Sequence, residues 1–331
     1  GYGKDTLNGG SGNDVLNGGF DNDILAGGAG NDTYYLWSNT GTDDVNEAAG
    51  AGTDLVITNL SFNLSLATNA NVENVTIDGN ALTVTGSGGA NVIEEDGGDN
   101  ILNGGGGNDT YIVNWRANQR GDAVTDSGGT DTLEAYITNF NGTDALSISG
   151  VESLEFEIGG ATQNIVNAAN IAVTASTELT LTNTNNGDSL TLNNLGSLGH
   201  ITVESTVGTL DLDLNYTAST ALDLVLFNAN LALSTTNLNP VLNVEIQGVD
   251  NTLDAEALSE VTEIDITGLG SQLSINNLDA ATTTLTFTNL VAQIFVNIEG
   301  AGGTDVLTID LQDANVQLDT EGDLEELDVT S

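Results

Sequence analysis

The chain has 331 residues, with 48 Asp and Glu against 3 Lys and Arg, and a formal net charge of −45. So few basic side chains exclude nucleic acid as a partner, because phosphate binding needs clustered Lys and Arg. Cys is absent and His occurs once, which excludes a disulfide framework and zinc sites built from several histidines. Hydrophobic residues make up 39%, enough for a packed core. A cation from outside must therefore balance the carboxylates.

Two further features of the sequence bear on the origin and the location of the chain. The chain starts inside a repeat and contains no Met, so we expect it to be a piece of a longer or processed protein. No segment approaches the ~20 consecutive apolar residues of a membrane span, so we expect no membrane span.

A nine-residue repeat dominates two segments of the chain. After a partial frame, residues 9–35 read GGSGNDVLN, GGFDNDILA and GGAGNDTYY without a break. A second run covers residues 86–112 and ends in GGGGNDTYI. Two residues after each Asp, or the Asn in its place, comes a large apolar or aromatic side chain. Seven frames in two registered runs indicate a repeat architecture.

This pattern resembles the RTX (repeats-in-toxin) calcium-binding nonapeptide G-G-x-G-x-D-x-U-x, where U is a large apolar residue, over about residues 1–36 and 86–113. The resemblance implies a parallel β-roll, in which a turn and a short strand alternate and repeats two apart stack on the same edge. It also implies several Ca²⁺ ions as cofactors.

The residue types suit this chemistry, because Ca²⁺ takes six to eight oxygen ligands and glycine permits turns with positive φ. By the resemblance, Asp5 pairs with Asp23 and Asp14 with Asp32, while Asn91 pairs with Asp109 at a weaker site. The predicted metal-site residues are Asp5, Gly10, Gly12, Asp14, Asp23, Gly28, Gly30, Asp32, Asn91, Gly105, Gly107 and Asp109.

Several positions depart from the pattern. Asp21 replaces a turn glycine, Glu95 and Asp96 replace both leading glycines of their frame, and Asn91 and Asn100 lack the charge of Asp. These departures put calcium binding in the second run in doubt. The alternative is that the repeats are plain Gly/Asn/Asp turns of a β-solenoid without calcium.

A larger repeat overlies the nonapeptides. Each run is followed by Gly-Thr-Asp, at 52–54 and 129–131, and then by V-E-x-[VL], at 72–75 and 151–154. A similar pair occurs at 303–305 and 324–327, and a remnant at 261–264. We therefore predict a first β-roll module at 1–85, a second at 86–160 and a Thr/Asn-rich β-solenoid at 161–331.

Short alternating segments fill the last part of the chain. Apolar residues alternate with Thr, Asn and Asp, which predicts half-buried strands. These are expected at 190–192, 201–203, 210–214, 222–226, 244–246, 264–266, 273–275, 285–287, 294–298 and 306–311. Their spacing suits a solenoid with two strands per coil or a β-sandwich. The predicted fold is all-β: parallel β-roll blocks followed by an elongated right-handed β-solenoid, with a β-sandwich as the alternative for the second half.

Catalytic interpretations have little support. His200 could pair with a Ser and an Asp, but a lone His at a strand start is far more often structural. Among 48 carboxylates, a pair at catalytic distance is uninformative. Trp37 and Trp115 each follow the last nonapeptide of a run, which favours capping of the roll over stacking on sugars. We expect a protein that is not an enzyme.

The composition of the second half resembles Thr/Asn-rich segments of bacterial surface-layer proteins and RTX adhesins. We therefore predict an extracellular or bacterial cell-surface protein, with type I secretion implied by the RTX resemblance. It would self-assemble with Ca²⁺ as a homo-oligomeric surface layer or filament. A cell-surface polysaccharide is a further candidate partner. The alternatives are the stalk of an RTX adhesin and the calcium-folding export domain of a secreted enzyme.

Overall fold

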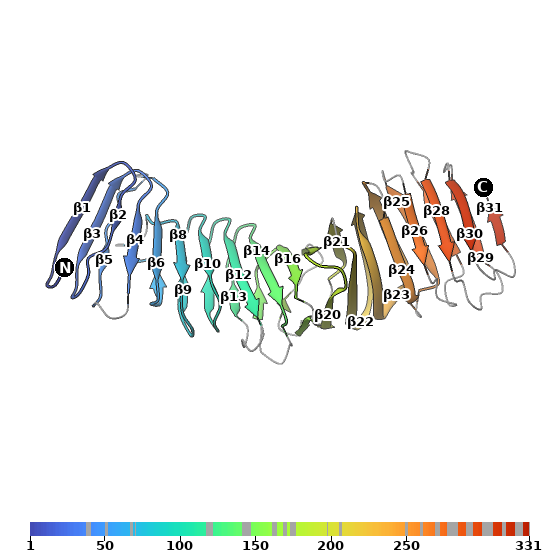
Figure 1. Cartoon of the computed structure of the whole chain (residues 1–331), viewed down its shortest axis with the longest axis horizontal. Coiled ribbons are helices and arrows are strands. Elements are labelled where there is room, and N and C mark those ends of the chain that lie inside the picture. Colours follow the sequence, from blue (N-terminus) through green and yellow to red (C-terminus); the bar gives the residue numbers. More distant parts are fainter. Residues whose placement is uncertain are drawn as a thin grey trace. The chain divides into compact units, whose positions relative to one another are not determined.

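In the part of the chain that it describes, a computed structural model (Figure 1) has β-strands as its only regular structure. It describes residues 1–37, 41–49, 52–66, 69, 71–116, 122–140, 147–160, 164–167, 171–172, 177–196, 198–204, 207–248, 251–258, 261–268, 272–276, 284–288, 294–299, 307–312, 316–321 and 327–330. Within these ranges there is no helix long and apolar enough to cross a membrane. The predicted all-β class is confirmed.

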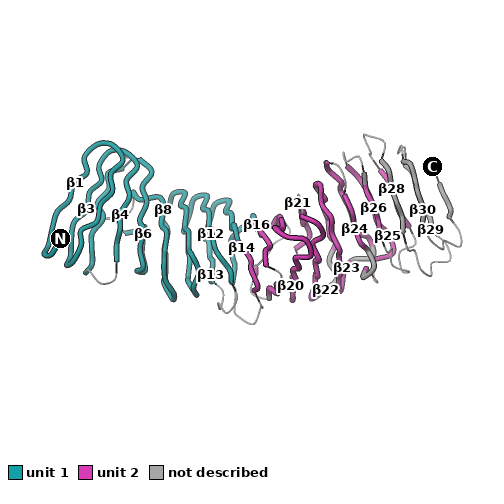
Figure 2. Tube along the Cα trace, viewed as in Figure 1, with its two compact units in different colours: residues 1–135, 143–153 teal, residues 136–142, 154–331 magenta. Residues whose placement is uncertain are grey.

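The chain divides into two compact units (Figure 2). Unit 1 comprises residues 1–135 and 143–153, and unit 2 comprises residues 136–142 and 154–331. Most of both predicted β-roll modules falls in unit 1. The Thr/Asn-rich segment falls in unit 2.

Unit 1 is a stack of coils whose strands form three parallel sheets. The first sheet contains β1 (Thr6–Ser11), β3 (Ile24–Ala29) and β5 (Asp44–Val45). The second contains β2 (Val15–Leu16), β4 (Thr33–Leu36), β6 (Leu55–Thr58), β8 (Asn74–Ile77), β10 (Val92–Glu95) and β12 (Thr110–Arg116). The third contains β7 (Phe62–Asn63), β9 (Thr83–Thr85), β11 (Ile101–Asn103), β13 (Ala123–Thr125) and β15 (Ser147–Ser149).

The register of these sheets follows the nonapeptide. Leu7 pairs with Leu25 and Leu16 with Tyr34, so repeats two apart stack as predicted. The large apolar position of the repeat points inward, because alternate side chains of a strand face opposite sides. From the second frame on, these side chains are at most 3% exposed: Leu16, Leu25, Tyr34, Ile93, Leu102 and Tyr111. Each contributes about 1.5–3 kcal/mol through burial.

Unit 2 continues with parallel strands on a longer coil. Two strands carry residues of both units, β14 (Thr132–Thr138) and β16 (Ser153–Gly159). The remaining strands are β17 (Asn164–Asn167), β18 (Ile171–Ala172), β19 (Glu178–Asn183), β20 (Asp188–Leu195), β21 (His200–Glu204), β22 (Thr209–Phe227), β23 (Asn230–Gln247), β24 (Asn251–Ala257), β25 (Glu263–Gly268), β26 (Gln272–Asn276), β27 (Thr284–Thr288), β28 (Ile294–Glu299), β29 (Leu307–Gln312), β30 (Val316–Glu321) and β31 (Leu327–Thr330).

The pairing in unit 2 decides between solenoid and sandwich. Leu190 pairs with Leu212, Leu212 with Leu233, and Ile264 with Leu285, all in parallel. A β-sandwich is built from antiparallel sheets, so that alternative is wrong and the parallel solenoid is confirmed. The predicted segments 210–214 and 222–226 are two parts of one strand, β22. Val306, at the start of the last predicted segment, lies outside the described residues.

Candidate metal centre

Acidic side chains stack along the edge of the second sheet of unit 1, each immediately before a strand. The Asp14 backbone N–H donates to Asp32 Oδ1 at 2.7 Å, and the Asp32 N–H donates to Asp54 Oδ1 at 2.8 Å. The Asp54 N–H in turn donates to Glu73 Oε2 at 2.8 Å. The side chains of Asp32, Asp54 and Glu73 thus each accept a hydrogen bond from the backbone of the preceding coil. We call this arrangement the Asp ladder.

The same geometry begins in the second run and continues after it. The Asn91 N–H donates to Asp109 Oδ1 at 2.6 Å, and the Asp109 N–H donates to Asp131 Oδ1 at 2.8 Å. The Asp131 N–H donates to Glu152 Oε2 at 2.9 Å. The Gly-Thr-Asp and V-E-x-[VL] elements therefore supply further rungs of the Asp ladder, a role that sequence reasoning did not assign to them.

The edge of the first sheet carries a matching set. The Asp5 N–H donates to Asp23 Oδ1 at 2.7 Å, and the Asp23 N–H donates to Asp43 Oδ1 at 2.9 Å. All three predicted pairs are thus brought together, one coil apart. Asp43 was missed, although it precedes its strand in the same way as the nonapeptide Asp residues.

The second oxygen of six of these carboxylates is buried and lacks a hydrogen-bond donor. Among the described residues, buried oxygens without a partner include Oδ2 of Asp14, Asp23, Asp32, Asp54, Asp109 and Asp131. Apart from Asp14, which is half-buried, these residues are at most 1% exposed. Burying a charge without a partner is costly. The Asp ladder therefore requires a cation or a proton, and carboxylate oxygens are ligands that Ca²⁺ prefers.

The turns beside the carboxylates are built from glycine for two reasons. The first is conformation: φ lies between 99° and 129° at Gly10, Gly12, Gly28, Gly30, Gly105 and Gly107, a region that side chains other than glycine rarely adopt. The second is space: a Cβ at Gly18 or Gly27 would collide with the unpartnered carboxylate oxygen of Asp23 or Asp32. These residues fit a calcium site, in which Asp carboxylates and turn carbonyls would hold the ion.

Crowding of the carboxylates alters their titration. Burial raises the pKa of Asp54 to about 6, and repulsion from Glu47, Glu73 and Asp32 adds to the effect. Burial likewise raises the pKa of Asp109 to about 7. A bound divalent cation would favour the ionised forms and reverse these shifts.

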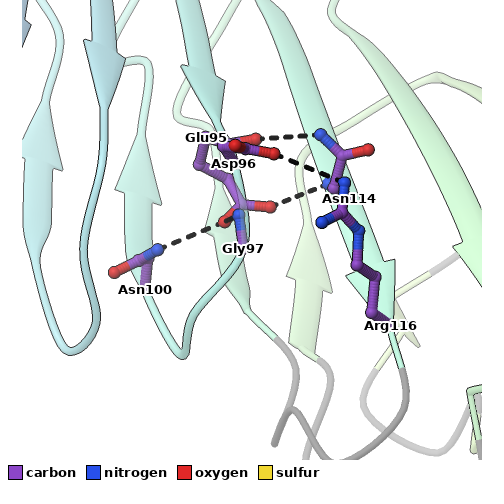
Figure 3. A network of polar contacts seen from close by, with 6 residues as sticks. All are labelled: Glu95, Asp96, Gly97, Asn100, Asn114 and Arg116. Atoms are coloured by element: carbon purple, nitrogen blue, oxygen red, sulfur yellow. Dashed lines mark hydrogen bonds and ion pairs between the residues drawn. The ribbon is translucent and has the colours of Figure 1, made fainter.

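One corner of the second run satisfies its carboxylate without an ion (Figure 3). Glu95, which replaces a leading glycine, is fully buried. Its Oε1 accepts the Asn114 N–H at 2.8 Å, and its Oε2 accepts the Gly97 N–H at 2.7 Å and the Asn100 amide at 3.3 Å. Burial raises the pKa of Glu95 to about 7, and repulsion from Asp122 contributes. Both oxygens have donors, in contrast to the Asp ladder.

The side chain of Asn91 also has hydrogen-bond partners within the chain. Its Oδ1 accepts the Ser87 N–H at 2.7 Å, and its Nδ2 donates to the Glu73 carbonyl at 3.0 Å. Across from it, the Asp109 Oδ2 keeps no partner. The charge at this predicted pair therefore comes from Asp109.

Basic and aromatic side chains do little to neutralise this edge. Arg116 forms an ion pair with Asp96 at 3.4 Å, with both side chains more than half exposed, a geometry worth about 0–1 kcal/mol. Trp115 is fully buried, and its Nε1 donates to Asp122 Oδ2 at 2.8 Å, so it belongs to the core rather than to a sugar-binding surface.

Comparison with known proteins assigns the two repeat runs. The RTX calcium-binding nonapeptide repeat matches residues 1–34 and 83–111, in four copies. No curated protein and no solved structure matches the chain. The matched segments contain every carboxylate and Asn of the predicted metal sites. These two segments of unit 1 are RTX calcium-binding repeats, and Ca²⁺, in several copies, is the ion they bind.

Proposed function

We propose that this is a secreted, non-catalytic structural protein that folds on Ca²⁺ and self-assembles through it into a surface layer or extracellular filament. The observation that carries the proposal is the row of buried carboxylate oxygens without donors in the Asp ladder. The chain offers 3 basic side chains against 48 acidic ones, so it cannot supply the missing charge itself.

Calcium binding would couple folding to location. Where Ca²⁺ is scarce, repulsion among the carboxylates keeps the chain expanded, which suits export. Extracellular calcium modules typically bind with Kd of about 10⁻⁴ to 10⁻³ M. Outside the cell, ions that bind the folded state and not the unfolded chain would stabilise the fold by mass action.

The acidic outer face of unit 2 supports a role for Ca²⁺ between subunits. Asp211 pairs with Ala232 on the next coil, and Ala232 pairs with Asp254 on the coil after that. The two Asp residues are therefore two coils apart in the same row. Burial raises the pKa of Asp211, and repulsion from Asp213 and Asp254 adds to it. Two copies of such a face repel each other unless divalent cations bridge them. We therefore favour a homo-oligomer held by Ca²⁺.

The test is a Ca²⁺ titration of the purified chain, followed together by circular dichroism and light scattering, with Mg²⁺ as the matched control ion. β-Structure and large particles that appear together, and reverse with chelator, support assembly. β-Structure in a chain that stays monomeric contradicts assembly and favours the adhesin stalk or the export domain. An absence of response in both signals contradicts calcium-driven folding as well.

A further inference from the structure

Each nonapeptide run is followed by an acidic cluster built partly from residues outside the repeats. Asp32, Glu47 and Asp54 each place a carboxylate oxygen within 4.8 Å of the others. A second cluster, of Asp109, Asp126 and Asp131, has the same property. The first member of each cluster lies in the segments that match the RTX repeat, and the other two lie beyond them.

No basic group among the described residues forms an ion pair with the carboxylates of the first cluster. Asp32, Glu47 and Asp54 are at most 5% exposed. Among the described residues, Asp32 Oδ2, Glu47 Oε2 and Asp54 Oδ2 are buried and have no hydrogen-bond partner. Three buried carboxylates that lie this close together, each with an unpartnered oxygen, are unstable unless a cation or protons neutralise them.

A tyrosine positions the outside carboxylate. The Tyr34 hydroxyl donates to Glu47 Oε1, which also accepts the Gly27 N–H at 2.8 Å, while Oε2 has no hydrogen-bond partner.

The second cluster is built similarly, but Asp126 is only half-buried and both of its oxygens have donors, since its Oδ1 accepts the Gly128 N–H at 2.9 Å. The Tyr111 hydroxyl donates to Asp126 Oδ2 at 2.7 Å, and it accepts the Gly104 N–H at 2.5 Å. Asp109 Oδ2 and Asp131 Oδ2 are buried without a partner. Both tyrosines occupy the large apolar position of the last nonapeptide of their run. The clusters share the tyrosine contact to the outside carboxylate, which is Glu47 in the first and Asp126 in the second.

We propose that these clusters, Asp32/Glu47/Asp54 and Asp109/Asp126/Asp131, are two terminal cation sites that bind Ca²⁺ and join the last repeat of each run to the coil that follows it. A dense set of carboxylates suits Ca²⁺ better than Mg²⁺, which dehydrates reluctantly and usually keeps several waters. The proposal rests on calcium binding by the chain and is independent of its assembly.

The first test counts ions by equilibrium dialysis of the full chain with Ca²⁺. Glu47→Gln and Asp126→Asn are each expected to lower the number bound by one, and the double variant by two. Asp44→Asn and Glu134→Gln are matched controls, since they remove exposed carboxylates from β5 and β14, and they should leave the number unchanged. An unchanged number in the double variant would overturn the proposal, whether or not the wild-type chain forms particles.

The second test separates ligand from structural roles by thermal unfolding. Glu47→Gln keeps an acceptor for Tyr34 and Gly27 but removes the unpartnered charge. We expect its melting temperature in chelator to equal or exceed that of the wild-type chain, and its gain on adding Ca²⁺ to be smaller. A melting temperature that falls equally with and without Ca²⁺ would show a purely structural role and contradict the proposal.

Discussion

The two units satisfy the same backbone requirement with different side chains. In unit 1, an Asp of the Asp ladder accepts an N–H from the preceding coil and leaves its second oxygen without a donor. In unit 2, Asn164 Oδ1 accepts the Phe140 N–H at 3.0 Å, and its Nδ2 donates to the carbonyls of Gly159 and Ser189, both at 3.2 Å. Asn251 is used in the same way, between Ala229 and Gln247.

The difference shows where calcium is needed. An amide carries its own donor, so a buried Asn can meet both an N–H and a carbonyl, whereas a carboxylate can only accept. The rule also holds inside unit 1, where the Asn100 amide donates to the Gly79 carbonyl at 3.2 Å. Among the described carboxylates of unit 2, Asp265 alone keeps a buried oxygen without a partner. Calcium dependence should therefore be concentrated in unit 1.

Removal of calcium should have the largest effect on stability. It should destabilise unit 1 much more than unit 2. At a Ca²⁺ concentration 100 times Kd, each site stabilises the folded state by about 2.7 kcal/mol. We expect a chelator to speed hydrogen exchange of β4 and β6 amides at least about 100-fold, and that of β20 and β22 amides less than tenfold. Equal acceleration in both units would contradict the comparison.

Replacing Asn164 of unit 2 with a carboxylate should destabilise the corner that its amide now satisfies without an ion. Asn164→Asp keeps the acceptor for Phe140 but turns an oxygen toward two carbonyls, at a cost of about 1–3 kcal/mol in the free energy of unfolding. Denaturant unfolding measures the loss. Asn186→Asp is the control, because Asn186 is exposed and uses its Oδ1 to accept the Thr209 N–H. If Ca²⁺ restores the stability of Asn164→Asp, the glycine turns of unit 1 are not required for binding.

Local patterns made part of this arrangement predictable. The nonapeptide period fixes coils of 18 residues, so the stacking of Asp14 on Asp32 follows from the sequence. Asp32 to Asp54 spans 22 residues and Asp54 to Glu73 spans 19, so those rungs match no constant period. Their membership of the Asp ladder depends on how the longer connections close. The terminal cluster at Glu47 depends on the Tyr34 contact. It could not be predicted from the sequence, because that contact also depends on how the connection after the repeats folds.

The corner at Glu95 should respond to pH and not to calcium. Burial raises the pKa of Glu95 to about 7 and that of Asp122 to about 6. The folded state then binds more protons than the unfolded chain between about pH 4 and pH 7, so this corner loses stability as pH rises through that range. Carbon NMR of the Glu95 carboxyl should report a midpoint near pH 7.

Two variants of this measurement sharpen the contrast with the Asp ladder. Asp122→Asn removes a repelling charge and should lower the pKa of Glu95. Ca²⁺ should leave the Glu95 midpoint in place, because both of its oxygens already have donors, while lowering the midpoint of Asp54. A Glu95 midpoint that falls on adding Ca²⁺ would show that this corner binds the ion after all.

The smallest effect should come from two buried tyrosine hydroxyls, one in each unit. Tyr216 donates to the Leu198 carbonyl at 3.0 Å, so Tyr216→Phe should cost about 1 kcal/mol with or without Ca²⁺. Tyr34→Phe should cost a similar amount in Ca²⁺ but less in chelator, because its hydroxyl holds Glu47 toward the ion. Denaturant unfolding of both variants in the two buffers supplies the four values. A loss for Tyr34→Phe that is as large in chelator as in Ca²⁺ would mean that this hydroxyl stabilises the fold directly, as Tyr216 does, and that the difference between the units does not extend to their tyrosines.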